Sequence, residues 1–197
     1  MYYKISPCED DDGDMLGFIF NYDHPARSFH EGIKFTSDPD APPWQQHPVT
    51  PIRLDIKPGR DKSPMPSFLS MPQPIMSRQL LTTLKEAGVT NIDAYPAELF
   101  YSDGSLASTD YYVVNVIGAV AAVDLAKSSF NPDQGSSILS MSFDSVTIDP
   151  EKAEAFLLFR LAENITTIVA HENVKKAVES AKIPLISFYQ MENVALL

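Results

Sequence analysis

The sequence predicts an α+β fold, in which a single domain has a mixed or mostly antiparallel sheet, two or three short helices and a proline-rich arm. Three observations predict it. Segments rich in branched and aromatic residues, which favour strands, outnumber the stripes with helical spacing. Residues 113–123 form an apolar run whose only polar side chain is Asn115. Ten of the 16 prolines fall within residues 39–74, where they exclude a central strand or a long helix.

The first half of the chain has few regular elements. Residues 2–5 and 15–22 have the composition of strands, and the acidic turn CEDDDGD lies between them. Within the proline-rich segment one short strand fits at residues 51–56. Trp44 and several methionines interrupt this segment and favour burial. We therefore expect residues 39–74 to form an ordered extended arm or long loop packed over the core.

The second half is more regular. A helix is expected to begin after Ser77, a typical N-cap residue, and to end near Gly88, a typical C-cap residue. The remaining pattern predicts strands at 92–100, 111–124, 138–148, 156–161 and 166–170, a last helix at 172–181 and a closing strand at 185–189.

The apolar run is too short to cross a bilayer, which needs about 20 apolar residues. We interpret residues 111–117 as the central strand of the sheet, with a bend or bulge at Gly118 and further buried chain up to Asp124. Asn115 should then be buried and hydrogen-bonded, because an unpaired buried amide costs about 1–3 kcal/mol.

Two segments look like copies of one unit. Residues 77–95 and 171–189 align without gaps, and apolar residues occupy corresponding positions in both. The pattern in each is a short amphipathic helix, a tight turn and a strand that packs back on the helix. Internal repetition and chance convergence on a common motif both explain this pattern.

Charge and composition bound the function. The 197 residues carry a net charge of −11, of which residues 1–50 contribute −6. Such a surface repels nucleic acid and anionic lipid and attracts basic partners, although acidity also serves solubility. No signal peptide or membrane segment is recognisable, so we expect a cytoplasmic protein. Cys8 is the only cysteine, which excludes an intrachain disulfide. The expected organisation is one domain, 1–197, with an N-terminal strand and arm region, 1–74, and a core, 75–197.

A search for chemistry finds no catalytic, cofactor-binding or metal-binding motif. The acidic turn fails the EF-hand pattern, because Met15 and Asn21 stand where glycine and glutamate are required. The four histidines show no metal-ligand spacing, and Cys8 lies beside acids that suppress its thiolate. Asp124 and Ser128 could form a ligand pair, but capping of a turn by Asp124 is the favoured interpretation. The sequence thus predicts a protein that is not an enzyme and needs no cofactor or metal.

Three stretches resemble one family in order and spacing. They are a Ser-led helix before Tyr95-Pro96, a YYxxNV strand leading to residues 124–128, and Phe159-Arg160-Leu161 before the closing helix. Together they resemble immunity family eleven of bacterial polymorphic toxin systems. The similarity covers roughly residues 75–190, with a looser match at 51–59. The chain departs from the family at residues 182–184, Lys-Ile-Pro, where a glycine is common.

The resemblance implies a cytoplasmic antidote that binds a toxin protein and blocks it, without catalytic residues. An acidic chain favours a basic toxin. Loops on a rigid sheet commonly carry recognition surfaces, so we expect the partner to contact residues 1–50. The candidate partner-binding residues are Asp10, Asp11, Asp12, Asp14, Phe29 and Trp44. The alternative is an enzyme or small-ligand-binding protein whose site is assembled from scattered polar residues.

Overall fold

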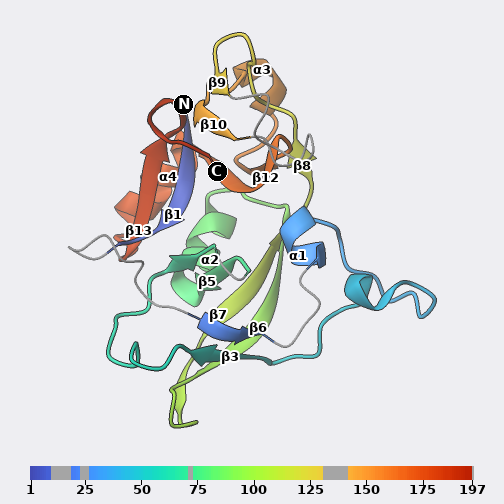
Figure 1. Ribbon diagram of the computed structural model, residues 1–197, viewed down its shortest axis with the longest axis vertical. Coiled ribbons are helices and arrows are strands. Elements are labelled where there is room, and N and C mark those ends of the chain that lie inside the picture. Colours follow the sequence, from blue (N-terminus) through green and yellow to red (C-terminus); the bar gives the residue numbers. More distant parts are fainter. Residues whose placement is uncertain (10–18, 23–26, 71–72, 131–141, 197) are drawn as a thin grey trace.

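The computed structural model describes residues 1–9, 19–22, 27–70, 73–130 and 142–196. It is rich in strands and has two main curled sheets, one above the other in Figure 1. The upper sheet has the order β13 (Ile186–Gln190), β1 (Tyr2–Pro7), β12 (Asn164–His171), β11 (Leu158–Leu161) and β8 (Ala119–Val120). The lower sheet has the order β2 (Ile19–Tyr22), β3 (Ile52–Ile56), β6 (Ile92–Phe100), β7 (Leu106–Val116), β5 (Ile75–Ser77) and β4 (Phe68–Leu69).

The sheets are mixed, as the sequence predicts. Only the pairs β11–β8 and β3–β6 are parallel among the described strands, and all other neighbours are antiparallel. A small third sheet pairs β9 (Ser129–Phe130) with β10 (Phe143–Ser145). The described chain contains four helices, one or two more than expected: α1 (Arg27–Glu31), α2 (Arg78–Glu86), α3 (Pro150–Ala153) and α4 (Glu172–Ser180).

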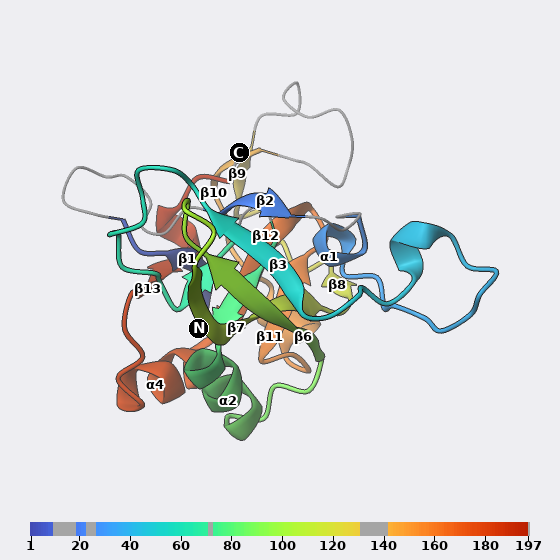
Figure 2. The same cartoon turned by 90° about the horizontal axis from the view of Figure 1, so that it is seen from below.

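The two repeated segments have the same structure. β5, α2 and β6 form one unit, in which β7 lies between the two strands and is antiparallel to both. β12, α4 and β13 form the other unit, with β1 in the corresponding place. The helices α2 and α4 are in contact and lie side by side in Figure 2. The sequence repeat is therefore a repeat of structure.

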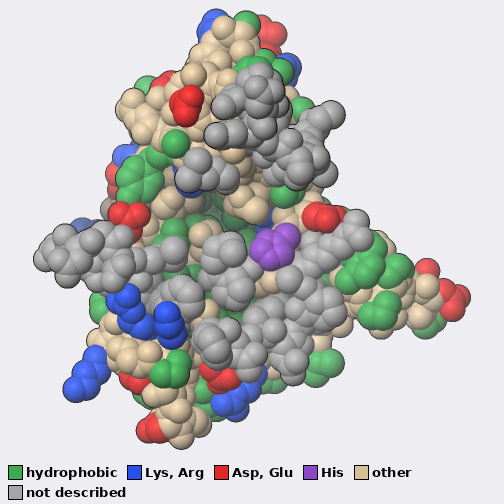
Figure 3. All heavy atoms as spheres, in the orientation of Figure 1, with side chains coloured by type: hydrophobic (Ala, Val, Ile, Leu, Met, Phe, Trp, Pro, Cys, Tyr) green, Lys and Arg blue, Asp and Glu red, His purple; other side chains and the backbone are tan. Residues whose placement is uncertain are grey.

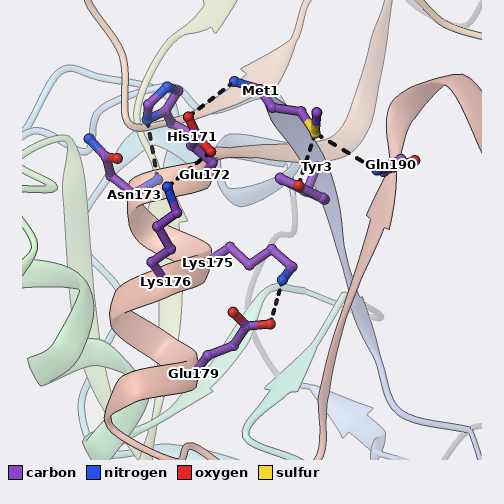
Figure 4. Close-up of polar contacts among 9 residues, drawn as sticks. All are labelled: Met1, Tyr3, His171, Glu172, Asn173, Lys175, Lys176, Glu179 and Gln190. Atoms are coloured by element: carbon purple, nitrogen blue, oxygen red, sulfur yellow. Dashed lines mark hydrogen bonds and ion pairs between the residues drawn. The ribbon is translucent and has the colours of Figure 1, made fainter.

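Equivalent residues begin and end the two helices. Ser77 accepts a hydrogen bond from the N–H of Leu80 at 3.2 Å, and His171 accepts one from the N–H of Asn173 at 3.3 Å. Gly88 and Lys182, each directly after the C-cap residue of its helix, both have positive φ, 95° and 51°. Figure 4 shows that α4 also has ion pairs between its own turns, from Lys176 to Glu172 at 3.1 Å and from Lys175 to Glu179.

One apolar cluster lies between the sheets. It contains Leu80 and Leu84 of α2, Val174 and Val178 of α4, and strand residues of both sheets such as Val114. Helical spacing places each of these pairs on one face, so the two helices bury their apolar stripes against the same core. A second cluster fills the other face of the upper sheet, and a third packs α1 on the lower sheet.

The apolar run is a central strand only as far as Val116. Asn115 is fully buried, and its side-chain N–H donates to the carbonyl of Ile33 at 2.7 Å, while its oxygen has no hydrogen-bond partner among the described residues. The chain bends at Gly118, which has φ of +82°, and continues into β8 of the other sheet. The prediction of one strand through residue 124 is therefore wrong, because the run crosses between sheets. Leu125, two residues beyond the run, is 47% exposed.

The proline-rich segment is ordered but largely irregular. It contains β3, β4 and a short 3-10 helix, η1 (Pro43–Gln45). Figures 1 and 2 show the part between α1 and β3 extending away from both sheets, whereas the sequence predicted an arm packed over the core. Proline fixes φ and has no N–H to donate to a neighbouring strand. A segment rich in proline can therefore follow an irregular path at the surface without leaving N–H donors unpaired at those positions.

Candidate partner-binding surface

Residues 36–46 form a loop that closes on itself. The N–H of Thr36 donates to the carbonyl of Gln45 at 2.9 Å, and Thr36 pairs with Gln46 in an isolated parallel bridge. The two ends are thus adjacent, while the chain between them projects outward, as Figures 1 and 2 show. A compact surface loop with adjoining ends is an Ω-loop, and such loops are frequently functional. Residues 36–46 are called the Ω-loop from here on.

The Ω-loop is held by its own hydrogen bonds. A carboxylate oxygen of Asp38 accepts the N–H of Asp40 at 2.9 Å, and the side-chain amide of Gln46 donates to the carbonyl of Ala41 at 3.0 Å. Three prolines, at 39, 42 and 43, restrict its backbone further. None of its residues is buried. The loop therefore keeps a definite shape without contributing to the core.

An aromatic cluster fixes the base of the Ω-loop. Phe35 and His47, the residues on either side of the loop, both lie against Tyr95 of β6, with ring centroids 5.4 and 6.1 Å away. His47 Nδ1 is also 3.2 Å from the Tyr95 hydroxyl. Phe29 of α1 packs edge-on against Phe35 at 4.8 Å and Tyr95 at 5.7 Å. Burial and the nearby carboxylate of Asp93 raise the pKa of Tyr95 to about 12, so its phenol is neutral at physiological pH.

The candidate residues fall into three groups. Trp44 lies in η1 on the Ω-loop and is partly exposed. Phe29 lies on the short helix α1 rather than in a loop, and it is fully buried in the core, so it is not on the surface of the unbound protein. A role in partner binding stays a prediction. The acidic run lies outside the described residues, and its role stays a prediction; it comprises Asp10, Asp11, Asp12 and Asp14.

Sequence reasoning missed most of the Ω-loop and its base. Asp38 and Asp40 are exposed on the loop, and Asp-Pro-Asp followed by Pro-Pro was the available signal for an ordered turn. Nothing local in the sequence indicated that Tyr95 would meet His47, because this contact depends on the position of β6 in the sheet.

Asp124 and Ser128 form a turn. One Asp124 carboxylate oxygen, Oδ1, accepts the N–H of Ala126 at 3.2 Å, and the other, Oδ2, pairs with Lys127 at 2.8 Å. The Ser128 hydroxyl donates to the Asp124 carbonyl at 2.8 Å and accepts the N–H of Thr147 at 2.9 Å. The hydrogen bond from Lys127 lowers the pKa of Asp124. These contacts hold the backbone, which supports the capping interpretation over a ligand pair.

Hollows on the described surface include a cavity between the sheets and a groove along α2. A cavity of about 270 Å³ between the sheets is lined by Lys4, Glu9, His30 and Arg160, among others. Burial lowers the pKa of three basic residues that line it, Lys4, His30 and Arg160, and that of Arg160 falls to about 10. A wider groove of about 740 Å³ runs along α2 beside Arg78. Within the described ranges, no three His, Cys, Asp or Glu side chains are grouped to hold a metal ion.

Comparison with known proteins identifies the family. No helix in the described part of the chain is long and apolar enough to cross a membrane. A search of curated proteins finds no match. The model of the immunity protein family Imm11 matches residues 2–193, and the match therefore includes the repeated units, the Ω-loop and both sheets. On this match, the chain belongs to the Imm11 family of immunity proteins.

Proposed function

We propose that this protein is an antidote that binds a cognate bacterial toxin domain in the cytoplasm and neutralises it by protein–protein contact. The observation that carries the proposal is the family match over residues 2–193. Neutralisation by binding needs a stable shape and a recognition surface rather than a catalytic centre. The projecting Ω-loop, which is held by its own hydrogen bonds and has no buried residue, is a surface of that kind.

The charge of the chain favours a basic toxin. At −11, the protein attracts cationic partners over long range and repels polyanions such as nucleic acid. We include the acidic run at residues 10–14 in this proposal, because its negative charge would attract a basic toxin. Replacing Asp10, Asp11, Asp12 and Asp14 with Asn should slow association with the toxin and weaken its salt dependence. Unchanged association rates across a salt series in this variant would contradict a role for the acidic run and would place the interface elsewhere.

Growth rescue tests the function in cells. The toxin domain encoded next to this chain is expressed from an inducible promoter, with and without this protein. The proposal predicts that growth stops with the toxin alone and resumes when the protein is co-expressed at equal or greater level. A catalytically dead toxin variant controls for the burden of expression. Continued growth arrest in the presence of soluble, folded protein would contradict the proposal.

The cavity between the sheets supports the alternative of a small-ligand-binding protein. Among the described residues, Arg160 and Lys4 line it together with one carboxylate, Glu9, so an anion would be the matching ligand. Inorganic phosphate and citrate are suitable probes. A rise in melting temperature that depends on ligand concentration, and that is lost in Lys4→Met, would favour this alternative. No change with either anion would leave the toxin-binding proposal as the better account.

A further inference from the structure

We infer that the Ω-loop is the element of this protein that enters the toxin, and that it fits a concave surface whose walls carry Lys or Arg. This inference rests on the proposed function and specifies the surface through which it acts. The loop is convex, so the complementary partner surface is a cleft. Figure 3 shows hydrophobic side chains along the projection and acidic atoms at its outer end.

The Ω-loop lies outside the apolar core. Long connections without regular strands or helices are uncommon in compact proteins and are usually functional. The ends of the Ω-loop are already adjacent through the bridge between Thr36 and Gln46, so a much shorter link would join them. None of residues 36–46 is buried. The three apolar clusters include none of these residues, so the core does not explain why the loop is present.

The Ω-loop is already ordered for binding in the unbound protein. A flexible loop loses conformational entropy when a partner immobilises it, and this loss reduces affinity. Here the hydrogen bonds from Asp40 to Asp38 and from Gln46 to Ala41 fix the tip before any partner arrives. The aromatic contacts of Phe35 and His47 with Tyr95 fix the direction in which it projects. Both the shape and the aim of the loop are set in the unbound protein.

The side chains of the Ω-loop combine negative charge with apolar area. Asp38 and Asp40 are exposed, and residues 36–46 contain no Lys or Arg, so the loop carries two negative charges with no internal compensation. Prolines and the partly exposed Trp44 supply apolar area behind the charges. An acidic tip on an apolar stem matches a cleft with cationic walls and an apolar interior. Enzymes that act on polyanions have such clefts, so a loop seated there would exclude the substrate.

The test uses three variants of the full chain. In the first, a Gly-Gly link replaces residues 37–45. In the second, Asp38→Asn and Asp40→Asn remove the charges while keeping the oxygen that accepts the Asp40 N–H. The third, Glu151→Gln with Glu192→Gln, is the charge-matched control, because both are exposed acids on α3 and η2 (Met191–Asn193). The probe is a catalytically dead form of the toxin domain encoded next to this chain.

Binding kinetics give the result. We expect the shortened variant to lose at least about 100-fold in affinity, because the central contacts of an interface carry most of its binding energy. The Asp38/Asp40 variant should associate about 10-fold more slowly at low salt and approach the wild-type rate at high salt. The control variant should differ less than about 2-fold from wild type. Melting temperatures of all variants show whether each is folded.

The outcomes separate the two claims. If the wild-type protein binds and the folded shortened variant binds equally well, the Ω-loop inference is wrong and the proposed function stands. If the wild-type protein does not bind the toxin domain, the proposed function fails and the inference fails with it. If the shortened variant does not fold, two other measurements test the inference: the association rate of the Asp38/Asp40 variant and amide hydrogen exchange in the wild-type protein. Toxin binding should slow the exchange of amides in residues 36–46, and unchanged exchange there would contradict the inference.

Discussion

The side chain of Arg160, on β11 of the upper sheet, donates its Nε–H to the backbone carbonyl of Val116, the last residue of β7 in the lower sheet, at 3.2 Å. The same guanidinium donates to the carbonyls of Ile165, at 3.0 Å, and of Phe29 in α1. Arg160 is 1% exposed, and among the described residues its partners are carbonyls rather than a carboxylate. A single buried cation therefore links α1 and both sheets.

Replacing Arg160 with Lys should destabilise the protein strongly. An ammonium group cannot reach three carbonyls in the fixed fork geometry of a guanidinium, so buried acceptors would lose their donors. We expect Arg160→Lys to lower the free energy of unfolding by about 2–4 kcal/mol, measured by urea denaturation. Arg53→Lys is the control, because Arg53 is exposed and pairs with Asp55 at the surface; its effect should stay below about 1 kcal/mol. Equal effects of the two substitutions would contradict the linking role of Arg160.

Gly32 lies directly beneath this link. A Cβ at position 32 would lie 2.6 Å from the Val116 carbonyl oxygen and 3.0 Å from Arg160 Cδ, and φ is +66°. Gly32→Ala should therefore lower the free energy of unfolding by about 3–4 kcal/mol. Gly59→Ala separates the two causes, since Gly59 also has positive φ, +86°, but nothing lies within 4 Å of its added Cβ. That control should cost only about 1 kcal/mol. Similar losses for both variants would mean that the close approach contributes nothing.

The sequence predicts the local parts of this fold well and the long-range parts poorly. Ser77 and Gly88 mark the ends of α2 because capping depends on neighbouring residues. The strand containing Arg160 was also expected, but its hydrogen bonds to Val116 and Phe29 depend on where distant segments cross. The end of β7 at Val116 has the same cause, because the apolar residues beyond it are buried in or packed on a different sheet.

Substitutions at the equivalent positions 88 and 182 of the two repeated units should have opposite effects on stability. Gly88 and Lys182 both have positive φ, which is unstrained for glycine and strained for lysine. Lys182→Gly should raise the free energy of unfolding by about 0.5–1 kcal/mol, and Gly88→Ala should lower it by about 1 kcal/mol. The Cβ added at Gly88 would make only an ordinary contact with Leu157, 3.4 Å away. A loss of stability in Lys182→Gly would contradict the structural equivalence of the two helix ends.

Tyr95, at the base of the Ω-loop, should make the free energy of unfolding fall as the pH rises into the alkaline range. Its folded-state pKa, about 12, lies above the ordinary value of 10.0, so the folded state favours the neutral phenol. This contribution to stability is complete below pH 10.0 and is lost as the pH rises towards 12. Burial also raises the pKa of Tyr2 and Tyr111, so wild type must be compared with Tyr95→Phe. The variant should lose less stability over this pH interval, and identical pH profiles would contradict burial of the Tyr95 phenol.

The candidate surface shows the same division between local and distant information. Trp44 was identified from its residue type alone and lies on the Ω-loop. The sequence places Phe29 among loop-forming residues, because the short helix α1 has no recognisable pattern. In the structure the Phe29 side chain is buried. The cluster of Phe35, His47 and Tyr95 joins the two ends of a loop to a strand far along the chain. Only the folded structure brings these rings together.

The most direct measurement is the affinity of the purified protein for the purified toxin domain encoded beside it, combined with the toxin's activity in the same samples. The account predicts a 1:1 complex with a dissociation constant on the order of nanomolar, and toxin activity that falls in proportion to the amount of complex. The toxin domain of an unrelated system, with similar net charge, should remain active and bind at least about 1000-fold more weakly. Absence of a complex at micromolar concentrations, or full toxin activity within the complex, would contradict the account.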